Sequence, residues 1–184
     1  MYKQQILTVV ALDPNNGWWP IVWAVVEQEN KDNWRWFIGF LIQDLKIVPT
    51  MHMTFISDKE KGLESSMYEL LPRCEHRTCV QYLYKNFKLA NNRGDFRDKL
   101  WECARASNQE WFNSAMEHLK DVDEKDYEWL QTHAPEQNRW CKAFYPLIVK
   151  SDMLCNNMSE SFHSFILHAR DKPIITMLET IRKK

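Results

Sequence analysis

The chain has 184 residues, and its 24 Lys and Arg residues nearly balance 25 Asp and Glu residues, which leaves a formal net charge of −1. This length suits one domain, alone or with an inserted subdomain. A composition of 45% hydrophobic and 27% charged residues, with four Gly and seven Pro, is that of a globular protein and excludes collagen-like or low-complexity chains. The near-zero charge excludes a uniformly basic nucleic-acid binder, although it is compatible with a local basic face.

Cysteine usage and hydropathy restrict the cellular environment. The five cysteines form an odd set without a Cys-x-x-Cys pair, which indicates reduced thiols in the cytosol or nucleus. The apolar stretch at residues 6–12 is too short to span a bilayer, and no secretory signal pattern surrounds it. We therefore expect no membrane as a partner.

The chain is predicted to begin with a β-hairpin. Residues 6–12 and 18–26 are apolar and rich in β-branched side chains, as is typical of strands buried on both faces. Residues 13–17 between them contain a Pro and an Asn-Gly pair, which favour a tight turn. Pro20 falls near the start of the second strand, where a missing N–H group is tolerated.

Helices and short strands are predicted to alternate after the hairpin. The first helix runs up to Leu45, and Asn30 or Asp32 is expected to cap it. A strand at 53–57, a helix at 59–71, a strand or bend at 74–78 and a helix from Cys79 onward follow. This order predicts an α/β layer with an antiparallel hairpin on its edge.

The remainder of the chain, from Asp95 onward, is predicted to be helical because its apolar residues keep a spacing of three to four. Two of the helices are expected at residues 159–168 and, after Pro173, at 174–182.

Charge varies along this path. The net charge is −3 over residues 1–72, +4 over 73–94, −6 over 95–136 and +4 over 137–184. We interpret the acidic block as a solvated helical face and the two basic stretches as candidates for phosphate contacts.

Two acidic residues are candidates for a catalytic or ligand-binding role, and each has an alternative structural role at the start of a helix. Asp58 follows an apolar strand and precedes a helix, a position where ligands and catalytic groups gather in α/β sheets. Alternatively, Ser57 or Asp58 caps that helix. Glu160 lies in the segment 156–162, where it has an alternative role as a capping-box or first-turn acid, and the two Asn residues of the segment are candidate caps.

For several other polar and aromatic residues, a structural role in the core is the preferred interpretation. Cys79 with His76 offers two zinc ligands where a structural site needs four, so we interpret Cys79 as a buried structural thiol. We interpret the paired tryptophans mainly as core residues: Trp18 with Trp19 and Trp34 with Trp36.

Several longer motifs occur together in an order that resembles one known family. They occupy residues 5–10, 13–27, 29–34, 55–59, 75–77, 156–162 and 172–175. In the content and order of these motifs, over nearly the whole chain, the sequence resembles the transposase domain of plant Mutator-like elements, the MULE transposases.

The resemblance implies a ribonuclease-H-like α/β fold, with a mixed sheet that is incomplete because its first strand is missing, and with an all-helical insertion. It divides the chain into a ribonuclease-H-like part at 1–86, a helical insertion at 87–150 and C-terminal helices at 151–184 that return to the catalytic core. It further implies a DDE mechanism of DNA cleavage and strand transfer, in which two Asp and one Glu hold two divalent ions, Mg²⁺ or Mn²⁺. Asp58 matches the second Asp of the family, and Glu160 is the best match for the Glu.

Two departures from the family pattern matter. The first Asp of the family lies on a strand before Gln5, and residues 1–4 do not contain it, while Asp13 belongs to the turn and is no substitute. We therefore expect weaker metal binding and a less stable sheet. The family also has a Cys-x-x-His pair after the second Asp, and here Tyr82 replaces the His that would follow Cys79. The zinc-knuckle region and N-terminal DNA-binding module of longer members are also expected to be missing.

We therefore interpret the chain as a fragment of a MULE transposase with little or no activity by itself. Its expected partner is DNA at the element ends, with a homo-oligomer as a further assembly, and its expected location is the nucleus. One alternative is a domesticated, transposase-derived DNA- or protein-binding protein without catalysis, whose basic stretches would make the contacts. Another is a piece that does not fold alone.

Overall fold

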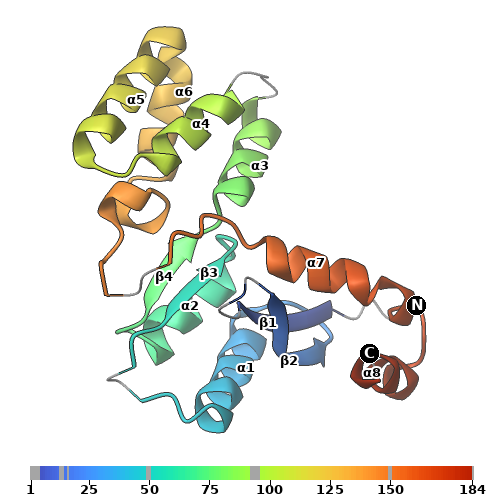
Figure 1. Cartoon of the computed structure of the whole chain (residues 1–184). Helices are drawn as coiled ribbons and strands as arrows, with labels where there is room; N and C mark the ends of the chain where they lie inside the picture. Colours follow the sequence, from blue (N-terminus) through green and yellow to red (C-terminus); the bar gives the residue numbers. More distant parts are fainter. Residues whose placement is uncertain are drawn as a thin grey trace. The chain divides into compact units, whose positions relative to one another are not determined.

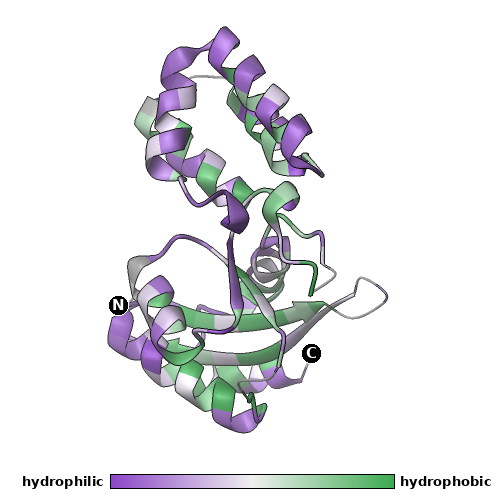
Figure 2. Ribbon diagram, turned by 90° about the vertical axis from the view of Figure 1, so that its left-hand side faces the viewer, coloured by the Kyte–Doolittle hydropathy of each residue, from purple (hydrophilic) through white to green (hydrophobic). Residues whose placement is uncertain are grey.

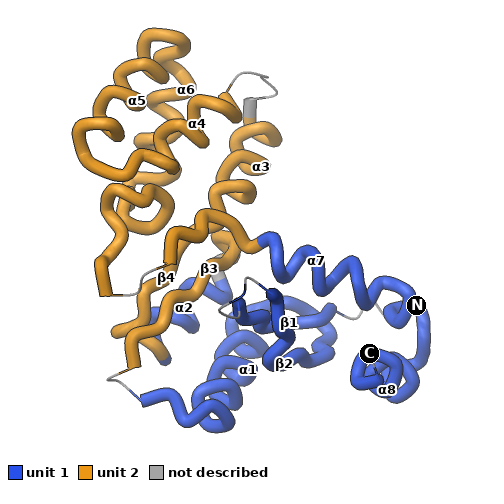
Figure 3. Tube along the Cα trace, in the orientation of Figure 1, with its two compact units in different colours: residues 1–48, 61–70, 157–184 blue, residues 49–60, 71–156 orange. Residues whose placement is uncertain are grey.

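The computed structural model describes residues 5–12, 15, 17–48, 51–91, 96–148 and 151–183. These residues form an α/β protein with small sheets and many helices (Figure 1). They fall into two compact units, which are described separately: unit 1 comprises residues 1–48, 61–70 and 157–184, and unit 2 comprises residues 49–60 and 71–156 (Figure 3). Within the described residues, no helix is both long and apolar enough to cross a membrane.

The predicted hairpin is present in unit 1. Strand β1 (Gln5–Leu12) pairs with β2 (Trp18–Val26) in antiparallel register, and the pairing shifts between Val9 and Val10. Val9 lies opposite Val22 and Val10 opposite Pro20, so Ile21 is the extra residue of a β-bulge. Pro20 can therefore occupy this strand beside a point where the ladder is already interrupted. Of the predicted turn, residues 13, 14 and 16 lie outside the described residues.

The hairpin is apolar on both faces because each face packs on helices. Alternate residues of a strand point to opposite faces, so Ile6 and Leu7 enter different clusters. Ile6 packs with residues of α7 (Asn157–Phe165) and α8 (Ile174–Arg182), such as Phe162. Leu7 packs with Trp34 and Phe37 of α1 (Lys31–Asp44). Figure 2 shows the resulting apolar colour along both strands of the hairpin.

Helix starts in unit 1 differ slightly from the prediction. Asn30, and not Asp32, caps α1, because its side chain accepts a hydrogen bond from the N–H of Asn33. Helix α2 (Lys61–Leu70) begins two residues later than predicted, so the expectation that Ser57 or Asp58 caps it is wrong. Helices α1 and α2 pack together and share the ion pair of Arg35 with Glu69 at 2.9 Å.

The C-terminal helices of unit 1 also follow the prediction with small shifts. Helix α7 begins at Asn157 rather than Ser159 and is followed by the 3₁₀ turn η3 (Leu167–Ala169). Helix α8 has the predicted bounds, with Pro173 at its N-cap position.

Unit 2 begins from a parallel pair of short strands. Strand β3 (Thr54–Ser57) pairs with β4 (Glu75–Thr78), which resolves the predicted strand or bend as a strand. The helical elements that follow are α3 (Val80–Asn91), α4 (Phe96–Arg105), α5 (Gln109–Val122), α6 (Glu124–His133), η1 (Gln137–Arg139) and η2 (Lys142–Phe144). The largest hydrophobic cluster lies here and includes Phe87 and Phe96, whose rings stack at 3.7 Å.

The interpretation of the paired tryptophans as core residues is mostly wrong. Trp34 is 8% exposed, but Trp18, Trp19 and Trp36 are 37%, 67% and 50% exposed. Trp36 points away from the face of α1 that carries Trp34, since two residues on a helix are about 200° apart. The predicted antiparallel hairpin is present, but within the described residues it is a separate two-stranded sheet and not the edge of one layer, while β3 and β4 form a second, parallel sheet. The division at residues 86 and 150 stays a prediction.

Candidate active site

Asp58 lies at the C-terminal end of β3, as the sequence predicts. Ser57 and Thr78 are the last residues of the paired strands β3 and β4, so Asp58 and Cys79 leave the sheet at the same end. The N–H of Cys79 donates to the carbonyl oxygen of Ser57 at 2.9 Å and extends the pairing by one step. The carboxyl ends of parallel strands are the positions where α/β sheets hold ligands.

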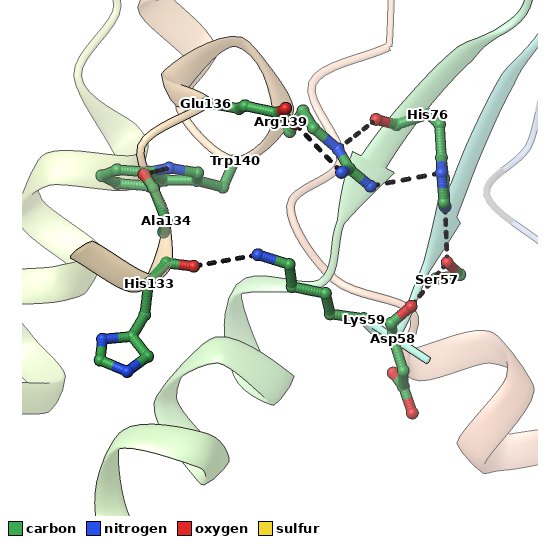
Figure 4. A network of polar contacts seen from close by, with 9 residues as sticks. All are labelled: Ser57, Asp58, Lys59, His76, His133, Ala134, Glu136, Arg139 and Trp140. Atoms are coloured by element: carbon green, nitrogen blue, oxygen red, sulfur yellow. Dashed lines mark hydrogen bonds and ion pairs between the residues drawn. The ribbon is translucent and has the colours of Figure 1, made fainter. Parts of the chain in front are cut away.

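A chain of hydrogen bonds fixes the backbone at Asp58 (Figure 4). Arg139 donates from Nη2 to Nδ1 of His76 at 3.3 Å and from Nε to the carbonyl oxygen of His76 at 3.1 Å. A guanidinium group can only donate, so Nδ1 of His76 is the acceptor and the ring proton lies on Nε2. Nε2 faces the hydroxyl oxygen of Ser57 at 2.7 Å, and that hydroxyl donates to the carbonyl oxygen of Asp58 at 2.9 Å.

These hydrogen bonds engage the main chain of Asp58. Its side chain is exposed and points away from His76 and Arg139 in Figure 4. The neighbouring Lys59 is held as well, because its ammonium group donates to the carbonyl oxygen of His133 at 3.0 Å. The arrangement thus holds the main chain on both sides of Asp58 while its carboxylate faces solvent.

Glu160 lies in the first turn of α7 and is exposed. An acid there is favoured by the positive end of the helix dipole, so the first-turn position predicted from the sequence is confirmed. Asn157 is already inside the helix, and the backbone N–H of Asn156 donates to Sγ of Cys79 at 3.4 Å. Glu160 belongs to unit 1 and Asp58 to unit 2. The catalytic roles of both residues stay predictions.

The donors available to a cation are carboxylates. Oxygen ligands of this kind suit a hard divalent ion such as Mg²⁺, so the chemistry of Asp58 and Glu160 fits the expected metal. Among the residues that the structure describes, no group of three or more His, Cys, Asp or Glu side chains is close enough to hold an ion. Cys79 is 5% exposed, as expected of a structural thiol. Both ring nitrogens of His76 are engaged by protein groups, which disfavours a zinc site with Cys79.

Two arginines of the basic stretches are buried, which sequence reasoning missed. Arg77 is 0% exposed: it forms two hydrogen bonds with Glu75, donates to the carbonyl oxygen of Ser151 at 2.7 Å and lies over the ring of Tyr145 at 3.6 Å. Arg139 is 8% exposed and pairs with Glu136 at 3.1 Å. The expectation of phosphate contacts is therefore wrong for these two cations.

The sequence contains a signal for only one of the interactions that these two buried arginines make. Glu75 and Arg77 are two residues apart on a predicted strand, so they share a face and their pairing could have been anticipated. The contact between Arg139 and His76 spans 63 positions, and nothing in the spacing of the sequence points to it.

Comparison with protein families settles the nature of the first part of the chain. Residues 1–86 match the MULE transposase domain. These residues therefore form a MULE transposase domain. No curated protein matches the chain. The match supports a transposase-related function, and it agrees with the resemblance drawn from the sequence motifs.

The MULE transposase domain includes the whole β3–β4 end described above. Asp58, His76 and Cys79 lie inside the matched residues, whereas Arg139 and Glu160 lie beyond them. Tyr82, which stands where the family pattern has His, is half-buried and packs against the core of unit 2.

Proposed function

We propose that this chain contributes Asp58 and Glu160 to a DDE-type centre that cuts DNA and joins it at the ends of a transposable element. The observation that carries the proposal is the position of Asp58 within the MULE transposase domain. Its main chain is held by Ser57, His76 and Arg139, while its carboxylate is exposed. An exposed carboxylate whose main chain is held in place is suited to binding a cation.

The proposed metal is Mg²⁺ or Mn²⁺, held by the carboxylates of Asp58 and Glu160 together with a third carboxylate. When bound, such ions activate the attacking oxygen and stabilise the leaving oxygen of a phosphodiester. The chain's own contribution is to present two acidic side chains from stable elements, the end of β3 and the first turn of α7.

We further propose a ribonuclease-H-like arrangement of the complete domain, a nuclear location, and a second copy of the chain as a partner besides DNA. These proposals rest on the membership of residues 1–86 in the MULE family and on its transposase character. The centre is proposed to use a third carboxylate besides Asp58 and Glu160, because the DDE mechanism uses three.

The test is a Mn²⁺-dependent nicking assay on supercoiled DNA with four proteins. They are the chain, the chain extended at its N-terminus by the Asp-bearing strand of the family, and Asp58→Asn and Glu160→Gln in the extended form. Asp44→Asn and Glu117→Gln are matched controls, because both acids are exposed and lie on the helices α1 and α5. Far-UV circular dichroism of every variant establishes that it is folded.

We expect nicking only in the extended chain, with a loss of at least about a hundredfold in Asp58→Asn and Glu160→Gln and none in the controls. Activity of the unextended chain would show that the third carboxylate lies within residues 1–184. Loss of the extended chain's activity in both variants would still support Asp58 and Glu160. Activity that survives Asp58→Asn would refute the assignment of that residue.

A second candidate function is protein or DNA binding without catalysis. One observation favours a protein partner: Trp36 and Phe40 on α1 are half-exposed, and their rings contact edge to face at 5.4 Å. They border a cavity of about 410 Å³ that Arg35 and Leu70 also line. Exposed aromatic groups of this kind are typical of contact surfaces. This function would be favoured if neither the chain nor its extended form nicks DNA although both are folded.

A further inference from the structure

The chain enters and leaves the helical segment of unit 2 at one place. The segment is entered through Cys79, between β4 and α3, and is left through residues 154–156. The N–H of Val80 donates to the carbonyl oxygen of Leu154 at 2.9 Å, and the N–H of Asn156 donates to Sγ of Cys79 at 3.4 Å. These two hydrogen bonds lie on either side of Cys155 in the sequence and hold it beside Cys79.

The two thiols share one environment. Cys79 and Cys155 are 5% and 8% exposed and belong to the same hydrophobic cluster. The side chain of Cys155 hydrogen-bonds to Cys79, and this is the main reason that the pKa of Cys79 is lowered to about 7. The backbone N–H groups of Asn156 and Tyr82 lower the pKa further, whereas burial and the charge of Asp58 raise it. The lowered pKa favours the thiolate of Cys79, which is the nucleophilic form of cysteine.

We propose that Cys79 and Cys155 form a redox clasp, in which a peroxide-class oxidant converts the two thiols into a disulfide that joins the ends of the helical segment 80–154. The thiolate of Cys79 attacks a peroxide oxygen and becomes a sulfenic acid, and the O–O bond breaks to release water or an alcohol. The thiol of Cys155 then attacks the sulfenic sulfur, and water leaves. The dithiol loses two electrons and two protons, and the peroxide gains them. This inference does not depend on the proposed DNA chemistry.

A second pair of cysteines in the same unit serves as an internal control. Cys103 and Cys141 are both 0% exposed, and the thiol of Cys141 donates to the carbonyl oxygen of Cys103 at 3.2 Å. Its sulfur is therefore directed at the backbone. Burial raises the pKa of Cys103 to about 12 and that of Cys141 to about 11, so both stay protonated at neutral pH. If proximity of two thiols were sufficient, peroxide would form a disulfide in both pairs. The redox clasp predicts a disulfide only between Cys79 and Cys155.

Trypsin places all five cysteines on different peptides, which makes the test direct. The folded, reduced chain is exposed to hydrogen peroxide, the remaining thiols are alkylated, and the peptides are identified by mass spectrometry without reduction. The expected product links peptide 78–85 to peptide 151–170 with the loss of two hydrogen atoms. The other cysteines remain alkylated on peptides 74–77, 100–105 and 140–142.

We expect the link between 78–85 and 151–170 to exceed any link between 100–105 and 140–142 by at least about tenfold. In Cys155→Ser, the sulfenic acid of Cys79 should accumulate and be trapped by dimedone, whereas Cys103→Ser should leave the link unchanged. Recovery of both clasp cysteines as alkylated thiols, or equal linkage of the two pairs, would overturn the proposal. The wild-type result decides the matter even where a variant does not fold.

Discussion

At the scale of single residues, two charged side chains are buried in the interior of unit 2 and make polar contacts there. Arg77 contacts a carboxylate, a carbonyl oxygen and an aromatic ring while it is fully buried, and Arg139 clamps His76 through its ring and its backbone. A buried cation is tolerated only where its donors are satisfied. Both arginines therefore stabilise the β3–β4 end, and phosphate contacts stay a prediction for the other cations of the basic stretches.

Replacement of Arg77 should be strongly destabilising. Arg77→Met keeps most of the volume but leaves Glu75 without its guanidinium partner, so we expect the free energy of unfolding to fall by about 3–5 kcal/mol. Urea unfolding followed by tryptophan fluorescence measures this change. The matched control is Arg73→Met, because Arg73 is exposed, and it should cost less than about 0.5 kcal/mol. Equal stability of the two variants would contradict the role assigned to Arg77.

At the scale of elements, helix ends and faces were set by local chemistry. Asn30 and Asn108 each precede a helix with an extended backbone, and each side chain accepts the N–H three residues later. These are two examples of one capping device, in α1 and α5. By contrast, α2 begins away from the two residues, Ser57 and Asp58, that its sequence offered as caps.

Removal of the α1 cap should have a moderate effect. Asn30→Ala leaves the N–H of Asn33 without its acceptor, and we expect a loss of about 1 kcal/mol in the free energy of unfolding. Asn30→Asp keeps a capping oxygen and should change stability by less than half of that amount. Thermal and urea unfolding of the pair give the comparison. A loss in Asn30→Asp as large as in Asn30→Ala would show that capping is not the cause.

The contact between α7 and the hairpin should weaken in acid. Burial, with a smaller effect of Arg170, lowers the pKa of His163 below its usual value of 6.5, and the ring Nε2 lies 3.3 Å from Oγ1 of Thr8. The unfolded chain therefore binds more protons than the folded one as the pH falls below about 6.5. This contribution to stability is complete above that pH and is lost as the pH falls towards the lowered value.

His163→Gln isolates that effect. The difference in unfolding free energy between wild type and variant should shrink between pH 7.5 and pH 5.5, as measured by urea unfolding at each pH. His168→Gln is the matched control, since it makes the same substitution at an exposed position shortly after α7. A difference for His163→Gln that does not depend on pH would refute the assignment.

At the scale of the whole molecule, charge limits what the chain does alone. Its formal net charge is −1, and two arginines of the basic stretches are buried. Arg182 and Lys183 at the end of α8 lie within 3.7 and 3.4 Å of Glu179, which reduces their net field. A chain of this kind has little long-range attraction for the DNA backbone.

Non-specific binding to duplex DNA should therefore be weak. We expect a Kd of about 10⁻⁴ M or higher at physiological salt, the weak end of the usual range for non-specific binding. Fluorescence anisotropy with a labelled duplex, repeated at several salt concentrations, should give a shallow dependence on salt. Micromolar binding with a steep dependence would instead indicate a basic surface on the folded chain.

The sequence by itself determined the elements and the position of Asp58. The hairpin, the helix order, the bounds of α8 and the strand end before Asp58 all follow from periodicity and capping, which act between neighbours in the chain. The motifs also pointed to the MULE family, which the match over residues 1–86 confirms. The catalytic roles of Asp58 and Glu160 stay predictions.

Only the tertiary structure decided which side chains meet. Arg77 and Arg139 became core residues, Trp19 and Trp36 became exposed, and Cys79 came to lie beside Cys155. Each outcome depends on segments that are far apart in the chain, as with Ser57, His76 and Arg139 at the β3–β4 end. A local pattern records the periodicity of one segment, but burial and pairing depend on what the fold places opposite it.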